Sequence, residues 1–231
     1  IVRKLRQTLK PLLQERAIAR RTPAVVGTRF APSRFHEIKT RPDEPRIRKE
    51  VKRIGKTSVE TDIILCFDRS GSMSGDKEQT CKEIAGTLYE AIRGIPQAST
   101  SIMGFDTTVD MIIENKKGSR EQAMKRIASG LSARGGTNFP LAFYQAIIKA
   151  TKKTARKKII IMLTDGDITG NIHLDDLVRF AEHHHLHVLV IGIQGSDEER
   201  IRHWFGKERT LYVENVSLLP TIMARTIKQL I

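Results

Sequence analysis

An acid and two hydroxyls at alternate positions, Asp68, Ser70 and Ser72, follow directly after the predicted strand 61–67, whose residues 63–67 are all apolar. An apolar run without alternation is typical of a parallel strand that is buried on both faces. Open α/β sheets bind their ligands where such strands end. Hard cations such as Mg²⁺ prefer oxygen ligands of this kind and keep several waters. The residues alone leave a second interpretation open, in which Asp68 and the serines only cap the following helix.

Two further loops carry similar chemistry. The glycine-rich loop 130–137 ends in Thr137 and enters a predicted helix, and Asp165 follows the apolar strand 158–164, with Asp167 two residues later. We expect all three loops at the same end of one sheet, where they would supply two strand-end carboxylates and three hydroxyls around one crevice. Helix capping explains each loop singly but not their joint placement. For Asp167, a second carboxylate of the site and a solvated turn position both remain open.

The elements that must position these residues alternate from residue 58 onward. We predict strands at 61–67, 99–105, 109–113, 158–164, 187–193 and 211–213, and helices at about 76–93, 119–129, 140–152, 174–184, 197–204 and 218–231. The short turn 106–108 makes 109–113 an antiparallel edge strand. Strands that alternate with helices indicate an α/β fold. The prediction is a doubly wound, mostly parallel six-stranded sheet with one antiparallel edge strand and helices on both faces.

Charge separates the chain into two parts. Residues 1–57 hold 17 Lys and Arg against 5 Asp and Glu, whereas residues 58–231 hold 23 against 21. Apolar residues at helical spacing predict a basic amphipathic helix within 1–21, which Pro11 is expected to kink or divide. Residues 22–57 contain four prolines and are expected to form an irregular, extended arm. We therefore predict a basic N-terminal helix and arm over 1–57 and one α/β domain over 58–231.

The three loops together resemble the von Willebrand factor type A family with its metal-ion-dependent adhesion site. The family signature is D-x-S-x-S, a Thr in a later glycine-rich loop and an Asp after the fourth strand, which Asp68, Ser70, Ser72, Thr137 and Asp165 match. The resemblance implies that the three hydroxyls coordinate Mg²⁺, or Mn²⁺ or Ca²⁺. The two carboxylates would hold coordinated waters. It further implies a protein-interaction module in which an exposed Asp or Glu of a partner completes the coordination.

The N-terminal part carries a second, looser resemblance. The stretch 27–38, followed by Pro45-Arg-Ile-Arg, resembles the segment before the domain in CobT-type cobaltochelatase subunits, and related proteins are partners of MoxR-type AAA+ ATPases. The acidic linker typical of CobT is absent from this sequence. The resemblance implies a non-catalytic accessory subunit of a MoxR/CobS-type AAA+ ATPase in the cytoplasm. Two cysteines and no apolar run of about 18 residues agree with a reducing compartment and no membrane partner.

Other functions fit the residues less well. An aspartyl-phosphate hydrolase needs a second carboxylate where Ser70 stands, and no G-x-x-x-x-G-K-[ST] motif for ATP occurs. The sequence therefore predicts no enzyme. Nucleic-acid binding through the basic arm stays open as the alternative function. The histidines at 183–185 and 187 suggest a transition-metal site, but consecutive helix residues point about 100° apart, which favours a polar helix end.

Overall fold

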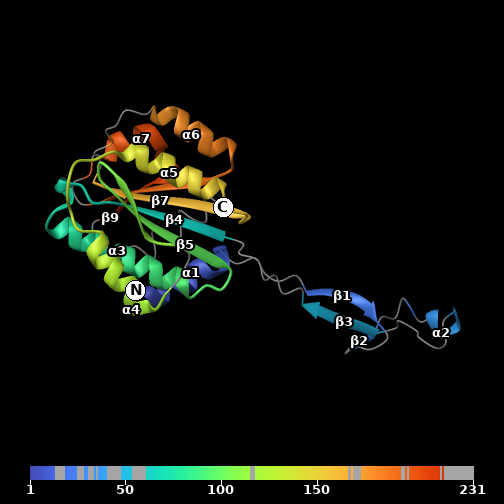
Figure 1. The fold of residues 1–231 in the computed structure, drawn as a ribbon. Coiled ribbons are helices and arrows are strands. Elements are labelled where there is room, and N and C mark those ends of the chain that lie inside the picture. The colour runs from blue at the N-terminus through green and yellow to red at the C-terminus, as the bar shows by residue number, and fades with distance from the viewer. Residues whose placement is uncertain are drawn as a thin grey trace. The chain divides into compact units, whose positions relative to one another are not determined.

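The structure is a computed structural model that describes residues 1–13, 19–24, 29–30, 34, 36–40, 48–53, 61–114, 118–165, 168, 173–193, 196, 198–213 and 215. The chain forms two compact units (Figure 1). One unit comprises residues 1–14 together with 58–231, and the other comprises residues 15–57. The N-terminal helix, which we expected to belong with the arm, is therefore part of the α/β unit. The predicted helix 218–231 and Asp167 lie outside the described residues.

The α/β unit is built on one six-stranded sheet of order β6-β5-β4-β7-β8-β9. The strands are β4 (Thr61–Asp68), β5 (Ala98–Phe105), β6 (Val109–Ile113), β7 (Lys157–Thr164), β8 (His187–Ile193) and β9 (Thr210–Val213). All neighbours pair in parallel except the edge hairpin β5–β6. Every residue of β4 is buried, which explains its unbroken apolar run. The predicted sheet, with its antiparallel edge, is confirmed.

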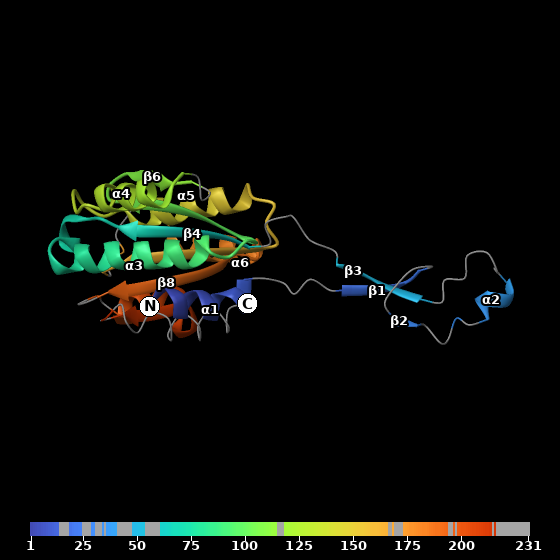
Figure 2. The same ribbon diagram turned by 90° about the horizontal axis from the view of Figure 1, so that it is seen from below.

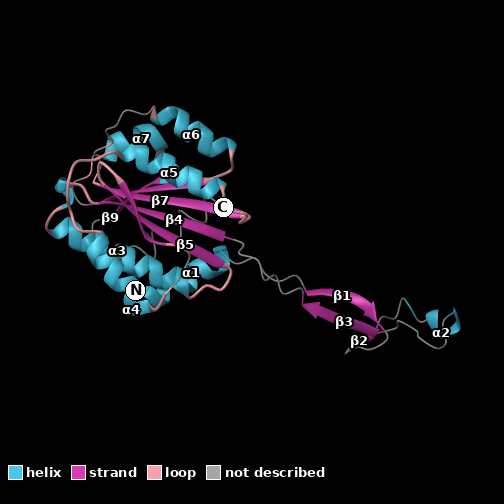
Figure 3. Ribbon diagram, in the orientation of Figure 1, coloured by secondary structure: helices cyan, strands magenta, loops and turns pink. Residues whose placement is uncertain are grey.

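Helices cover both faces of the sheet (Figure 3). Helices α3 (Asp76–Arg93) and α4 (Arg120–Gly130) pack on one face, and α5 (Phe139–Thr151), α6 (Leu174–His183) and α7 (Glu198–Phe205) pack on the other. Alternate residues of each strand enter one of two hydrophobic cores: Ile63 and Leu65 face α3, whereas Ile64 and Cys66 face α5. No helix in the described ranges is long and apolar enough to cross a membrane.

Helix α1 (Val2–Leu13) completes the first face and runs through Pro11, which does not divide it. Its buried residues Leu5, Leu9 and Leu13 repeat every four positions and join the core beside α3 (Figures 1 and 2). Arg6 donates to the carbonyl of Glu90, 2.7 Å away, near the C-terminal end of α3. A cation there meets carbonyls that the helix leaves unpaired.

The second unit is more regular than the predicted arm. Strands β1 (Ala19–Ala24), β2 (Arg29–Phe30) and β3 (Arg48–Arg53) form an antiparallel sheet of order β1-β3-β2, and α2 (Glu37–Thr40) is a single short turn. The prediction of an irregular segment was wrong for these strands. Periodicity could not reveal them, because β3 contains one apolar residue and β1 contains a proline.

Candidate metal centre

The two predicted carboxylates stand at the ends of neighbouring parallel strands. Asp68 is the last residue of β4, and Asp165 directly follows β7. The register pairs Phe67 with Leu163, so both acids emerge at the carboxyl end of the sheet, one residue apart in register. Both are buried, with 1% and 8% of their surface exposed. The sheet geometry therefore brings together two acids that lie nearly 100 residues apart in the chain.

Hydrogen bonds around Asp68 arrange the loop that follows it. Asp68 Oδ1 accepts from the backbone N–H of Ser70 at 2.9 Å, and Oδ2 accepts from the hydroxyl of Thr164 at 2.8 Å. The hydroxyls of Ser70 and Ser72 lie 3.0 Å apart and bond to each other. Helix α3 begins after Gly75 and has no side-chain cap. The capping interpretation is therefore wrong for α3, and these polar groups converge on one another.

Asp165 forms an ion pair with a residue that the sequence did not single out. Lys77 Nζ, from the first turn of α3, lies 3.0 Å from Asp165 Oδ2. Asp165 Oδ1 is buried and has no hydrogen-bond partner among the residues that the structure describes. Burial raises the pKa of Asp68 to about 6, and the nearby negative charge of Asp165 adds to the rise. The centre thus holds more acceptor oxygens and negative charge than the described side chains around it neutralise.

The loop that carries Thr137 contacts the Ser70 loop through its backbone. Gly71 donates its backbone N–H to the carbonyl of Gly135 at 2.9 Å, which ties the Thr137 loop to the turn between Ser70 and Ser72. Gly135 has a φ of +65°, a conformation that side chains with a Cβ rarely adopt. Thr137 is half-buried, two residues beyond this contact. The structure thus links Asp68, Ser70 and Ser72 by hydrogen bonds, places Asp165 at the end of the neighbouring strand close enough to act electrostatically on Asp68, and brings the backbone beside Thr137 to the Ser70 loop.

Arg69 joins this loop to the edge hairpin. Its side chain is 4% exposed, its Nε lies 3.0 Å from Asp106 Oδ2, and its Nη2 pairs with Asp110. Its Nη1 donates to the carbonyl of Gly130 at the end of α4, at 3.3 Å. One buried guanidinium therefore spans three elements that surround the centre. The sequence signal was the arginine inside the D-x-S-x-S loop, but its partners lie at least 37 residues away.

Arg134 repeats the same two pairings from the Thr137 loop. Its backbone N–H donates to the carbonyl of Arg69 at 2.6 Å, and its guanidinium contacts Asp106 at 3.0 Å and Asp110 at 2.7 Å. Burial alone would raise the pKa of Asp106, but hydrogen bonds from Thr108 and Arg134 outweigh it and hold the pKa below its ordinary value. The two arginines and two aspartates hold the Ser70 loop and the Thr137 loop together.

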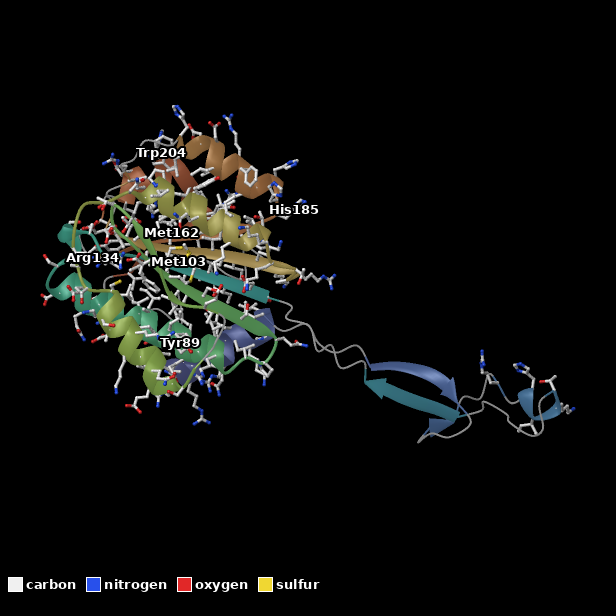
Figure 4. The ribbon with its side chains drawn as sticks, viewed as in Figure 1. Tyr89, Met103, Arg134, Met162, His185 and Trp204 are labelled. Atoms are coloured by element: carbon white, nitrogen blue, oxygen red, sulfur yellow. The ribbon has the colours of Figure 1, made fainter. Side chains whose placement is uncertain are left out.

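The histidine that Figure 4 labels, one of those considered for a transition-metal site, lies away from these loops. Arg134 marks the end of the sheet where the loops gather, and His185 lies at the opposite end (Figure 4). No three His, Cys, Asp or Glu side chains come close enough to hold a metal ion among the described residues. Cys66 and Cys81 are free and buried.

A scan of known families matches the von Willebrand factor type A domain over residues 62–225. The chain belongs to this family. Domains of the family mediate protein–protein interactions, so the predicted family, and with it a module of this general kind, is confirmed.

Known proteins share part of this sequence or its fold. Protein sll0103 of Synechocystis sp. is 31% identical over 106 residues, which cover 46% of this chain and 25% of that protein. The von Willebrand factor domain of the pilus tip protein Mfa5 from Porphyromonas gingivalis superimposes with a TM-score of 0.62 at 12% identity, over 74% of this chain and 96% of that one. Proximal thread matrix protein 1 from the mussel byssus, with a zinc-occupied adhesion-site motif, gives 0.61 at 18% identity, over 74% and 45%. The chain thus spans a quarter of its curated relative.

The residues present fit a divalent cation. The candidate ligands offer only oxygen atoms: two hydroxyls 3.0 Å apart and two buried carboxylates, one of which has an oxygen without a hydrogen-bond partner among the described residues. A buried oxygen without a hydrogen bond is costly, and an ion or an ion-bound water removes that cost. Oxygen donors select hard cations over the soft ones that thiolates and imidazoles bind.

Proposed function

We propose that this chain is a divalent-cation-dependent protein-interaction module whose ion is Mg²⁺, with Mn²⁺ or Ca²⁺ able to replace it. Ser70, Ser72 and Thr137 would hold the ion through their hydroxyls. Asp68 and Asp165 would accept hydrogen bonds from its waters. The observation that carries the proposal is the buried Oδ1 of Asp165, which has no hydrogen-bond partner among the described residues, at the end of the strand next to the one that leads into the hydroxyl pair of Ser70 and Ser72.

The bound ion supplies an electrophilic open position that a carboxylate can fill. Neutral hydroxyl ligands support this role, because they leave more of the ion's charge uncompensated than carboxylate ligands would. The chain's own contribution is rigidity. Asp68 is fixed by Ser70 and Thr164, and the Arg69 network holds the Thr137 loop against the Ser70 loop. The partner group in this proposal is an exposed Asp or Glu side chain.

The partner class rests on the N-terminal resemblance. We propose a MoxR/CobS-type AAA+ ATPase as the partner and a non-catalytic, cytoplasmic role for this chain. The identity of Ser70 supports the non-catalytic role, because an aspartyl-phosphate hydrolase would carry its acid/base carboxylate at that position, and the Ser70 hydroxyl instead bonds to Ser72.

Metal and carboxylate binding can be tested with matched serine variants. Isothermal titration with Mn²⁺ should show one site in the wild-type chain, strong weakening in Ser72→Ala and little change in Ser74→Ala. Ser74 lies two residues further along the same exposed turn and is no predicted ligand. A random peptide library displayed on phage, selected in Mg²⁺ and eluted with EDTA, should yield peptides that share an acidic residue. Equal Mn²⁺ affinity in both variants would refute the site, and no EDTA-sensitive peptide would refute the docking role.

Nucleic-acid binding by the second unit remains the alternative. Residues 15–57 hold 13 Lys and Arg against 5 Asp and Glu. The β1–β3 register places Arg20 opposite Lys52 and Ala24 opposite Arg48. Such an accumulation of basic residues on a small sheet is typical of phosphate-backbone contacts. Oligonucleotide binding that falls steeply with salt and ignores EDTA would favour this function over the metal-dependent one.

A further inference from the structure

A pocket of about 320 Å³ adjoins the metal centre on its hairpin side. Its polar lining comes from Arg69, Arg126, Arg134, Asp110 and two serines, and Met111 and Ile112 supply apolar surface. Arg69 stands between Asp68 and Ser70 in the chain and lines the pocket, so the loop of the candidate centre also forms one wall of the pocket.

The charges of the lining favour an anion. Three guanidiniums and one carboxylate, that of Asp110, line the pocket. Asp106, which does not line the pocket, pairs with two of these guanidiniums. Even with Asp106 counted, one positive charge remains. That charge belongs to Arg126, which is exposed on α4 and pairs with no carboxylate of the described residues. Its neighbour Lys125 pairs with Glu121.

We propose that this pocket binds a second acidic side chain of the same partner segment whose first acid binds the metal, so that the module selects paired acids. This inference rests on the proposed function. Arg126 would pair with the second carboxylate, and the hydroxyls of Ser129 and Ser132 can donate to it. A singly charged carboxylate suits a pocket that already contains Asp110 better than a doubly charged phosphate does. The exposed side chain of Met111 offers contact to the methylene groups of a glutamate.

The distances along the partner are compatible with such pairing. An extended segment advances about 3.3 Å per residue, and side chains two residues apart point to the same face. Acids separated by one or a few residues can therefore reach the metal and the pocket together. Linking the two contacts in one segment would raise the affinity without any change at the metal.

The test uses peptides from the selection described above and two charge-reversal variants of the full chain. Arg126→Glu changes the pocket, and Lys125→Glu makes the same change of charge at the adjacent, already paired residue outside it. We expect EDTA-sensitive peptides to carry two acids. Replacing the second acid by its amide should weaken binding to the wild type about fivefold, as for a favourable exposed ion pair. The same replacement should have no effect on Arg126→Glu and should keep its full effect on Lys125→Glu.

Each alternative outcome would overturn the pocket, the metal-bridged docking or both. EDTA-sensitive peptides with a single acid, or equal peptide affinities in the two variants, would overturn the pocket and leave metal-bridged docking intact. Failure to select any EDTA-sensitive peptide would overturn both. If Arg126→Glu instead abolished binding of an oligonucleotide and left acidic peptides bound normally, the pocket would serve nucleic acid and the inference would be wrong.

Discussion

Replacement of Lys77 by glutamine should strengthen metal binding, because the Lys77 ammonium occupies the carboxylate that the ion needs. Lys77 Nζ lies 3.0 Å from Asp165 Oδ2, and the two side chains are 29% and 5% exposed. A charge-assisted hydrogen bond contributes about 1.5–3 kcal/mol, and the exposure of Lys77 argues for the lower end. Loss of about 1.5 kcal/mol of competition corresponds to about tenfold tighter binding. Removal of a positive charge beside a cation site acts in the same direction.

Titration calorimetry with Mn²⁺ measures this change, with Lys82→Gln as the matched control. Lys82 lies on the same helix and pairs with Glu78 outside the centre, so its loss changes the net charge equally. We expect tighter binding only in Lys77→Gln. Without metal, the same variant should unfold more easily, because Asp165 loses its counter-ion, and Mn²⁺ should restore the difference. An equal increase of Mn²⁺ affinity in both variants would mean that only the net charge matters. Weaker Mn²⁺ binding by Lys77→Gln would show that Lys77 instead positions Asp165 for the ion.

Three further changes test other parts of the structure. Arg69→Gln should lower the free energy of unfolding by about 3 kcal/mol and weaken Mn²⁺ binding, because it leaves a buried ion-pair network without its cation. The side chain of Arg134 is 59% exposed, so Arg134→Gln should lower the free energy of unfolding by less than about 1 kcal/mol. Equal urea midpoints for the two variants would contradict this difference. Leu9→Ala should lower the free energy of unfolding by about 2–5 kcal/mol, and Leu12→Ala, at a half-buried position, should lower it less. If Leu9→Ala left the urea unfolding curve unchanged, α1 would not be part of the folded core. Burial raises the pKa of Asp68 to about 6, so the metal-free fold favours the protonated carboxyl. The protonated carboxyl therefore stabilises the fold below about pH 4, and this stabilisation is lost as the pH rises through about 6. The affinity for Mn²⁺ should therefore fall as the pH drops below about 6. Calorimetry that finds the same affinity at about pH 5 and about pH 7.5 would refute the assignment of Asp68 to the metal site.

The sheet and most of the centre could be predicted because their signals are local. A strand buried on both faces needs an unbroken apolar run, and parallel strands bring their ends together whatever sequence lies between them. Asp68 and Asp165 each follow such a run directly, so their meeting required only the correct strand order. The alternation of strands with helices restricted that order to a few possibilities.

The supporting contacts could not be predicted, because they depend on side-chain reach across elements. Nothing in the sequence distinguishes Lys77 from other lysines of α3, and only the packing of that helix brings its ammonium to Asp165. Arg69 stands at an unspecified position of the D-x-S-x-S pattern, and its partners Asp106 and Asp110 come from a different strand pair. Long polar side chains have several rotatable bonds, so periodicity carries no information about where their charged ends lie.

A chain with a net charge of +14 can retain a cation centre only if its positive charges are neutralised or kept away. Around the centre they are neutralised in pairs: Lys77 with Asp165, Lys82 with Glu78, and Arg69 with two aspartates. Most of the unbalanced charge belongs to residues 15–57, which form their own compact unit. Arg126 pairs with no carboxylate of the described residues, and it lines the pocket where, in our proposal, a partner's second acid would bind. In the proposed function, this pairing of charges would protect the ion and leave the charge of Arg126 available for recognition.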